Sequence, residues 1–379
     1  MVNPQNKIRV VFCTNTFDSS NHGPAKFARL IREINSVNTG IELVTLTRDI
    51  IQSKPGVYVL HDKFAKVLRP IYMLAINIDY VIGLRSLKKN FDYDLVVFNN
   101  AITGVLFKML YRGHVKVIGM INDENSLSRQ NYTMAGSFKY ILRFKIFRFV
   151  EKFSAKRFDM IIANSRYIRG KIIKEYSVPS EKVGLVYKGI EVSKFPEYQT
   201  KTIDQKGTIK ILFVKSDPVV GGLKYLIGAL EQMNTRRIEL IIVGDQGPIN
   251  YVPKGSHLSI DYRGLVTEDG VYKIMKEEAH IFCVPSIKEG LGVANMEAAL
   301  HSLPIIATRV GGVPEVLTNN ALLIRPGSTT DIIAAIEKVL DNENLAQSLT
   351  FAAYSDIRSR FSHENALQMF TNCLDIALN

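Results

Sequence analysis

Short apolar runs alternate with segments of helical periodicity from one end of the chain to the other. In the first half, the runs that predict strands are residues 8–14, 41–46, 95–98, 115–120, 160–163 and 183–186. In the second half, they are residues 209–214, 239–243, 258–262, 281–284, 305–308 and 321–324. Repeated strand–helix order is typical of parallel sheets that helices cover on both faces. The pattern therefore predicts an α/β protein.

The two sets of strands are separated by a polar stretch, residues 189–205, which is rich in Lys, Thr and Glu and contains Pro196. We expect two doubly wound, Rossmann-like domains, residues 1–190 and residues 191–360, that face each other across a cleft. Residues 361–379 are expected to form a C-terminal helix, and its return to the first domain is one option. Ligands of such domains bind at the carboxyl ends of the strands, so the cleft is the expected site.

The composition indicates a globular protein, since 46% of the 379 residues are hydrophobic. The three cysteines, Cys13, Cys283 and Cys373, lie far apart without metal-type spacing, which fits a reducing compartment. No apolar stretch precedes the first predicted strand. The longest apolar run, residues 71–84, is interrupted by Asp79 and is too short to span a bilayer. We therefore expect a cytoplasmic protein.

Positive charge is concentrated in the first half of the chain. Residues 1–190 contain 30 Lys and Arg against 14 Asp and Glu, a net charge of +16, whereas residues 191–379 contain 18 against 22, a net charge of −4. A basic half indicates an anionic binding partner, or it serves only to keep the protein soluble. Nucleic acid is disfavoured, because no finger, RNP-type or helix-turn-helix signature is present. Basic and large apolar residues mix in residues 66–89 and 140–150, which favours an anionic membrane surface; core-packed helices with basic polar sides explain the mixture equally well.

One segment of the second half carries a dense pattern of chemistry. Residues 285–304 read Pro-Ser-Ile-Lys-Glu-Gly-Leu-Gly-Val-Ala-Asn-Met-Glu-Ala-Ala-Leu-His-Ser-Leu-Pro, and a short strand and Gly-Gly-Val-Pro-Glu follow. Glu289 lies in a glycine loop, and Glu297, after seven intervening residues, lies inside the next helix. A glycine loop that opens a helix offers backbone N–H groups and the positive end of the helix dipole to a phosphate. Glu297 can accept two ribose hydroxyls and Glu289 can hold a sugar, so the segment suits a sugar joined through phosphates to a nucleoside.

This order of parts resembles the donor-binding site of glycosyltransferase family 4, the retaining enzymes of GT-B fold. The resemblance rests on the Glu-x7-Glu after Pro-Ser and on the Gly-Gly-x-Pro-Glu turn after the next strand. It is strong over residues 209–317, moderate over residues 157–195 and weak over residues 1–120. It implies transfer of a sugar from a nucleotide-sugar donor to a hydroxyl acceptor with retention, without a cofactor and without a bound metal.

The resemblance also implies roles for residues of the second domain. Glu289 would be a catalytic residue whose carboxylate positions the donor sugar and stabilises charge. Glu297 would bind the ribose. The backbone of Val266, in a Gly-x-Val sequence, would bind the nucleobase. Further donor contacts are expected from Ser286, Gly290, Leu291, Gly292 and Val293.

Two places in the first domain are candidates for the acceptor. Asn21-His22-Gly23-Pro24 follows the first predicted strand, where family members often carry a glycine pair. Gly23 is therefore a candidate residue of an acceptor or phosphate loop, and an ordinary strand-to-helix turn is the equal alternative. Asn122 and Asp123 stand where many family members have a His-Asp pair. Asn122 cannot titrate, which weakens a general-base role there, whereas Asp123 is a candidate contact to the acceptor hydroxyl, or else a helix N-cap.

The chain departs from the family after the first strand of the second domain. The arginine and lysine with which family members clamp the donor diphosphate are replaced by Ser216 and Gly221. Lys215 is the closest remaining cation, and we expect it to share the clamp with the amides of residues 290–293. A solvated Lys215 is the alternative.

Taken together, these patterns predict a metal-independent, retaining hexosyl- or related glycosyltransferase. The basic first half favours a lipid-linked saccharide acceptor, as in surface polysaccharide or lipopolysaccharide biosynthesis, and a peripheral position at the inner face of the cell membrane. Three alternatives stay open: a soluble small-molecule acceptor, a nucleotide-sugar binding protein without turnover, and a nucleic-acid binding protein.

Overall fold

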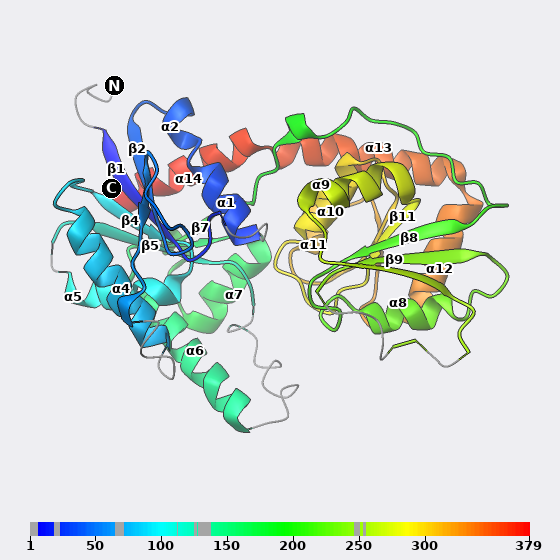
Figure 1. Ribbon diagram of the computed structural model, residues 1–379, viewed down its shortest axis with the longest axis horizontal. Helices are drawn as coiled ribbons and strands as arrows, with labels where there is room; N and C mark the ends of the chain where they lie inside the picture. The colour runs from blue at the N-terminus through cyan, green and yellow to red at the C-terminus, as the bar shows by residue number, and fades with distance from the viewer. Residues whose placement is uncertain are drawn as a thin grey trace. The chain divides into compact units, whose positions relative to one another are not determined.

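The chain divides into two compact units, here named unit 1 and unit 2. A computed structural model describes residues 7–18, 23–64, 72–111, 113–124, 127, 138–245, 251–252 and 255–379, without the side chains of residues 138–140. Unit 1 comprises Met1–Gly189 and His363–Asn379, and unit 2 comprises Ile190–Ser362. Each unit has its own parallel sheet with helices packed on it (Figure 1). Within the described residues, no helix is long and apolar enough to cross a membrane.

Unit 1 is built on a seven-stranded sheet of order β3-β2-β1-β4-β5-β6-β7, in which every pair is parallel. Its strands are β1 Ile8–Thr14, β2 Ile41–Thr47, β3 Val57–Val59, β4 Leu95–Phe98, β5 Lys116–Ile121, β6 Met160–Ala163 and β7 Val183–Leu185. Its helices are α1 Gly23–Ile31, α2 Ile34–Val37, α4 Tyr72–Leu87, α5 Val105–Leu110, α6 Phe138–Arg157, α7 Arg166–Tyr176 and α14 His363–Leu378. The strand order reverses between β1 and β4, and the carboxyl ends of strands at such a point form the usual ligand site of doubly wound folds.

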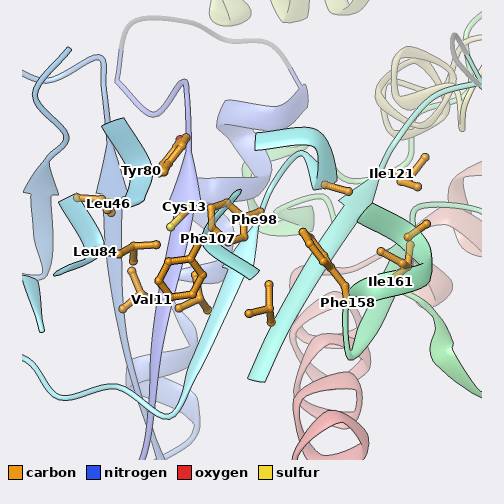
Figure 2. Packing of buried hydrophobic residues seen from close by; sticks show 14 of the residues in the cluster. Val11, Cys13, Leu46, Tyr80, Leu84, Phe98, Phe107, Ile121, Phe158 and Ile161 are labelled. Atoms are coloured by element: carbon orange, nitrogen blue, oxygen red, sulfur yellow. The ribbon is translucent and has the colours of Figure 1, made fainter. Parts of the chain in front are cut away.

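Successive residues of β1 point to opposite faces of this sheet and enter two apolar layers. Val11 and Cys13 pack on the side of α4, α5 and α7, among the aromatic side chains that Figure 2 labels. Val10 and Phe12 pack on the other side, against α1 and α14. The ring of Phe12 lies 6.3 Å from that of Phe370 in α14. The last helix of the chain is therefore part of the core of unit 1.

Unit 2 is built on a six-stranded parallel sheet of order β10-β9-β8-β11-β12-β13. Its strands are β8 Ile209–Val214, β9 Ile238–Val243, β10 Ser259–Gly264, β11 Ile281–Val284, β12 Ile305–Thr308 and β13 Leu322–Ile324. Its helices are α8 Leu223–Leu230, α9 Glu268–Lys273, α10 Val293–Leu300, α11 Val313–Val316, α12 Thr329–Asp341 and α13 Glu343–Arg360, and a π-helical turn, Ile274–Glu278, follows α9. The strand order reverses here between β8 and β11.

The predicted α/β class with two doubly wound parallel sheets is confirmed. Each predicted strand is present, with ends that differ by at most two residues from the expected ones. The structure contains one further strand, β3, which the pattern did not predict, because a run of three residues is too short to show an alternation of apolar and polar residues. It becomes a strand because β2 offers an open edge, to which Leu60 also donates a hydrogen bond at the Thr47 carbonyl, 2.6 Å away.

The two stretches in which basic and apolar residues mix have different structures. Where it is described, the stretch of residues 66–89 forms α4, whose residues Ala75, Ile76, Tyr80 and Leu84 are buried in the core of unit 1. Core packing therefore explains part of that pattern, since Tyr72, Leu74 and Ile82 of α4 are 47%, 49% and 44% exposed. In α6, Leu142, Ile146 and Phe149 are 47%, 54% and 70% exposed.

Candidate active site

Two groups that the sequence places 74 residues apart form an ion pair in unit 2. Lys215 directly follows β8, and Glu289 lies in the loop after β11, the neighbour of β8 in the sheet. The Lys215 ammonium donates a hydrogen bond to Oε2 of Glu289, and the Ser286 Oγ lies 3.5 Å from the same oxygen. The two charged side chains are 23% and 19% exposed, so the pair is partly shielded from water yet accessible. It lies at the point of unit 2 where the strand order reverses.

The Gly-Gly turn after β12 allows the Glu289 loop to adopt this position. Gly311 has a φ of +55°, which L residues rarely adopt. A Cβ at Gly311 would lie 1.7 Å from the carbonyl oxygen of Glu289, so any side chain would push the two loops apart. The loop is also held by Thr308 at the end of β12, whose hydroxyl donates to the carbonyl oxygen of Ser286.

The glycine loop after Glu289 leads directly into α10. Gly292 is the N-cap of this helix with a φ of +88°, and Val293 is its first residue. The N-cap glycine has no side chain to accept from the first amides of the helix, so those N–H groups have no side-chain cap. An anion beside Lys215 and this helix start would meet a cation and the positive end of the helix dipole.

Glu297 lies in the second turn of α10 and is buried, with 8% of its surface exposed. The hydroxyl of Tyr272 lies 3.3 Å from its Oε1 and 2.6 Å from Oε1 of Glu268. Burial, together with the charge of Glu297, raises the pKa of Tyr272, so this hydroxyl remains a donor. Tyr272 thereby connects Glu297 to α9, which begins two residues after Val266.

Three aromatic rings pack together beside Glu297 in unit 2. The ring of Tyr272 packs 5.0 Å from Phe195 and 5.1 Å from His301. Burial lowers the pKa of His301 to about 4, so the ring is neutral near pH 7. Its Nδ1 lies 2.7 Å from the carbonyl oxygen of Glu297, where Nδ1–H donates and fixes the end of α10. Tyr272 is a contact of Glu297 that the sequence analysis missed, and no local pattern distinguishes it from the other tyrosines.

The second candidate region is a cavity of about 220 Å³ in unit 1, at the carboxyl ends of β1, β4 and β5. The polar and charged residues that line it include Thr14, Asn15, Thr16, Asn99, Asn100, Thr103, Asn122, Asp123 and Glu151. Two predicted site residues, Asn122 and Asp123, thus lie in one cavity. Gly23 begins α1, whose second residue, Pro24, also lines the cavity. His22 and Asn21 lie outside the described residues.

Three asparagines form a ladder at this edge of the sheet, each directly after a strand. Asn164 after β6 donates to the carbonyl of Asn122, 2.8 Å away, and Asn122 after β5 donates to the carbonyl of Asn99, 3.1 Å away. Asn99 after β4 donates to Thr14 Oγ1 and to the Pro24 carbonyl, both at 3.0 Å. The side-chain oxygens of all three asparagines are buried without a partner among the described residues. The recurrence of asparagine after predicted strands was a usable sequence signal.

Glu151 of α6 is the second residue that the sequence analysis missed. It is buried and accepts a hydrogen bond of 2.6 Å from the Tyr176 hydroxyl. Burial raises its pKa to about 8, and the nearby charge of Asp123 adds to the increase. Its signal in the sequence was slight: Glu151 is the lone acid among the apolar and basic residues of α6.

Among the described residues, no three His, Cys, Asp or Glu side chains gather as a metal site requires. The chain contains the sequence Asp92-Tyr93-Asp94, a spacing that can serve divalent ions. Both carboxylates lie before β4, at the opposite edge of the sheet from the cavity, and pair with Arg9 at 3.2 and 3.7 Å. Asp92 also pairs with Lys88, which holds the pKa of Asp92 below its usual value.

Solved structures of low sequence identity have the same fold. The sucrose-phosphate synthase of Thermosynechococcus elongatus has a TM-score of 0.77 at 16% identity, over 98% of this chain and 99% of that one. HepE of Anabaena in complex with UDP-glucose has a TM-score of 0.71 at 17% identity, over 97% of this chain and 99% of that one. With its two parallel α/β sheets, the chain has the GT-B fold.

Sequence comparison assigns the family. A model described as "Glycosyltransferase Family 4" matches residues 28–194, and one described as "Glycosyl transferases group 1" matches residues 208–342. The O-antigen chain mannosyltransferase RfbU of Salmonella typhimurium is 24% identical over 238 residues, 60% of this chain and 63% of that protein. The uncharacterized glycosyltransferase MJ1607 of Methanocaldococcus jannaschii is 23% identical over 235 residues, 58% of this chain and 60% of that protein. The matches span less than two thirds of the length of these relatives. On the two family models, the chain belongs to glycosyltransferase family 4.

Proposed function

We propose that the protein transfers a sugar, with retention, from a nucleotide-sugar donor to a hydroxyl of a lipid-linked saccharide. The observation that carries this proposal is the Lys215–Glu289 ion pair beside the start of α10, at the strand reversal of unit 2. A nucleoside diphosphate sugar needs a cation and amides for its phosphates, and an acid for its sugar hydroxyls. These groups converge there.

The reaction follows from the charges that these groups carry. Glu289 holds the donor sugar and stabilises positive charge as the bond to the diphosphate breaks, and Glu297 accepts the ribose hydroxyls. Lys215 and the amides of residues 290–293 stabilise the leaving diphosphate without a metal. The departing phosphate oxygen helps to take the acceptor proton on the same face, which retains the configuration. In unit 1, Asp123 and Asn122 contact the acceptor.

The acceptor class is supported by the relatives. RfbU acts, by its name, on O-antigen chains. WaaG, with a TM-score of 0.68 at 16% identity, is described as a glycosyltransferase involved in lipopolysaccharide biosynthesis. The charge of +16 in residues 1–190 agrees with an acceptor carried on an anionic lipid.

A transfer assay tests the activity. The protein is incubated with a panel of nucleotide sugars, and release of the nucleoside diphosphate is measured with and without membrane extracts as acceptor. We expect one donor to be consumed faster with lipid extract than without it. A soluble acceptor is indicated if small saccharides replace the extract. A nucleotide-sugar binding protein is favoured by the loss of the arginine and lysine at Ser216 and Gly221, and binding of a donor without any turnover would establish it.

The lipid-linked acceptor also predicts contact with anionic membranes through α6. Its exposed Leu142, Ile146 and Phe149 lie on successive turns, and the exposed cations Arg143 and Lys145 lie between them. We expect flotation with anionic vesicles that weakens as salt rises, and little binding to neutral ones. The double variant Ile146→Ser/Phe149→Ser should bind the anionic vesicles less, whereas Ile376→Ser, which changes an exposed residue of α14, should bind as the parent does. Equal binding to both kinds of vesicle would contradict the proposal.

A further inference from the structure

The cavity of unit 1 differs in charge from the basic half of the chain that contains it. Among the described residues, the charged residues that line it are Asp123 and Glu151, both acids, and the other polar lining residues are neutral threonines and asparagines. Among the described residues, no lysine, arginine or histidine lines it. The charge of the described lining therefore differs from the net charge of the half that contains it.

The hydrogen bonds in the wall define which groups the cavity can satisfy. Asn99 is 7% exposed, and its amide protons are both donated, to Thr14 and to the carbonyl of Pro24. Asn122 donates to the carbonyl of Asn99. The buried carboxamide oxygens of Asn99 and Asn122 have no partner among the described residues. The lining also contains the side chains of Asn15, Thr16 and Asn100, whose amide and hydroxyl groups can donate as well as accept. A ligand with uncharged hydroxyl groups, which likewise donate and accept, complements such a lining.

The carboxyl group of Glu151, which also lines the cavity, keeps its proton at neutral pH. Its carboxyl group accepts from Tyr176, and burial raises its pKa to about 8. A neutral carboxyl group exchanges one hydrogen bond as donor and one as acceptor with a sugar hydroxyl. An anionic ligand would meet the Asp123 carboxylate and would force charge into a buried wall, which is unfavourable for phosphate and for carboxylate alike.

We propose that this cavity receives the uncharged polyol end of the acceptor, and that the Asp123 carboxylate and the buried, uncharged wall beside it disfavour a phosphorylated or carboxylated sugar at that end. The inference rests on the proposed function, since it names the substrate class of the acceptor site. It follows that any phosphate of a lipid-linked acceptor lies outside the cavity.

Saturation-transfer NMR on the full-length protein tests the proposal. The probes are methyl glycosides of glucose, galactose and mannose, each with its 6-phosphate and its uronic acid, added with and without saturating UDP. We expect at least one neutral glycoside to bind, and its two anionic analogues to bind at least about tenfold more weakly, because like charges a few ångströms apart repel at the surface dielectric.

Substitution of Asp123 locates this preference in the cavity. At pH 7, Asp123→Asn should narrow the difference in affinity between neutral and anionic glycosides several-fold, whereas Glu181→Gln, which removes an exposed acid of unit 1 away from the cavity lining, should leave that difference unchanged. Glu151→Gln replaces one uncharged side chain by another at this pH and should change the difference much less. Should Glu151→Gln fail to fold, Asp123→Asn alone decides, because Asp123 is exposed.

The proposal is overturned if the anionic analogues bind as well as the neutral glycosides, or if no glycoside binds. Calorimetry with nucleotide sugars on the same samples reports on unit 2. Loss of glycoside selectivity with intact donor binding therefore refutes this inference alone, whereas loss of donor binding refutes the proposed function.

Discussion

Neither candidate site follows the net charge of the sequence half that contains it. Residues 1–190 carry a net charge of +16, yet the charged groups that line the unit 1 cavity among the described residues are two acids. Residues 191–379 carry −4, yet the site in unit 2 places the cation Lys215, paired with Glu289, beside a helix start. Net charge reflects the exposed surface, whereas a site is defined by the few groups that converge at the carboxyl ends of the strands. We therefore expect unit 2 to bind the anionic part of the donor and unit 1 a neutral part of the acceptor.

The largest effect is expected at the cation of unit 2. Lys215→Ala should lower turnover by about 10²–10³, because the leaving diphosphate loses its cation in a partly shielded site. Initial rates with saturating donor measure it. Lys224→Ala, an exposed lysine on the nearby helix α8, is the matched control and should be neutral. A rate for Lys215→Ala close to that of the parent would remove Lys215 from the site.

The ribose contact is expected to contribute less. Glu297→Ala should lose roughly 1.5–3 kcal/mol of donor binding, the range for hydrogen bonds to a charged group. Calorimetry with the cognate nucleotide measures this loss, and circular dichroism shows that the variant is folded. Glu337→Ala on the exposed face of α12 should bind the nucleotide normally. Unchanged affinity in folded Glu297→Ala would refute the assignment.

The acid of unit 1 should make stability depend on pH. Glu151 has a folded-state pKa of about 8, above its ordinary 4.5, so the folded protein keeps a proton that the unfolded chain loses between these values. Its contribution to stability is therefore complete below pH 4.5 and is lost as the pH rises towards 8.

Glu151→Gln removes this dependence, since a glutamine can still accept from Tyr176 but does not titrate. The free energy of unfolding of the variant minus that of the parent should increase by on the order of 2 kcal/mol as the pH rises from about 6 to about 7.5, because the parent loses stability over this range. Urea unfolding of both proteins at several pH values measures the change. A constant difference across that range would show that Glu151 is ionised in the fold, and that both acids of the cavity are charged.

The smallest effect is expected at Tyr272, which donates to Glu297. Tyr272→Phe should weaken donor binding by about 1 kcal/mol, the net value of one such hydrogen bond. In the Glu297→Ala background the same change should have almost no effect, because the residues would then share no contact. Additive losses in this double-mutant cycle would show that Tyr272 acts independently of Glu297.

The strands, and the local arrangement of the candidate site residues around the start of α10, could be predicted from the sequence. Buried parallel strands are continuous apolar runs, so twelve of them were recognisable without contacts. Glu289, Gly292 and Glu297 lie within one strand–loop–helix segment, where local spacing fixes their order around the start of α10. β3 was not predicted because its three residues are too few to show a pattern, and it forms by pairing with the open edge of β2.

The resemblance to the family predicted that Lys215 and the Glu289 loop belong to one site, but their ion pair and the unit 1 cavity became visible in the three-dimensional structure. Lys215 and Glu289 belong to strands that are adjacent because β11 inserts beside β8, and the order of strands is not written in any local pattern. Thr14, Asn99 and Asn122 likewise meet because β1, β4 and β5 are neighbours. Glu151 reaches the same cavity from α6, and its proton is held by burial, which long-range packing alone decides.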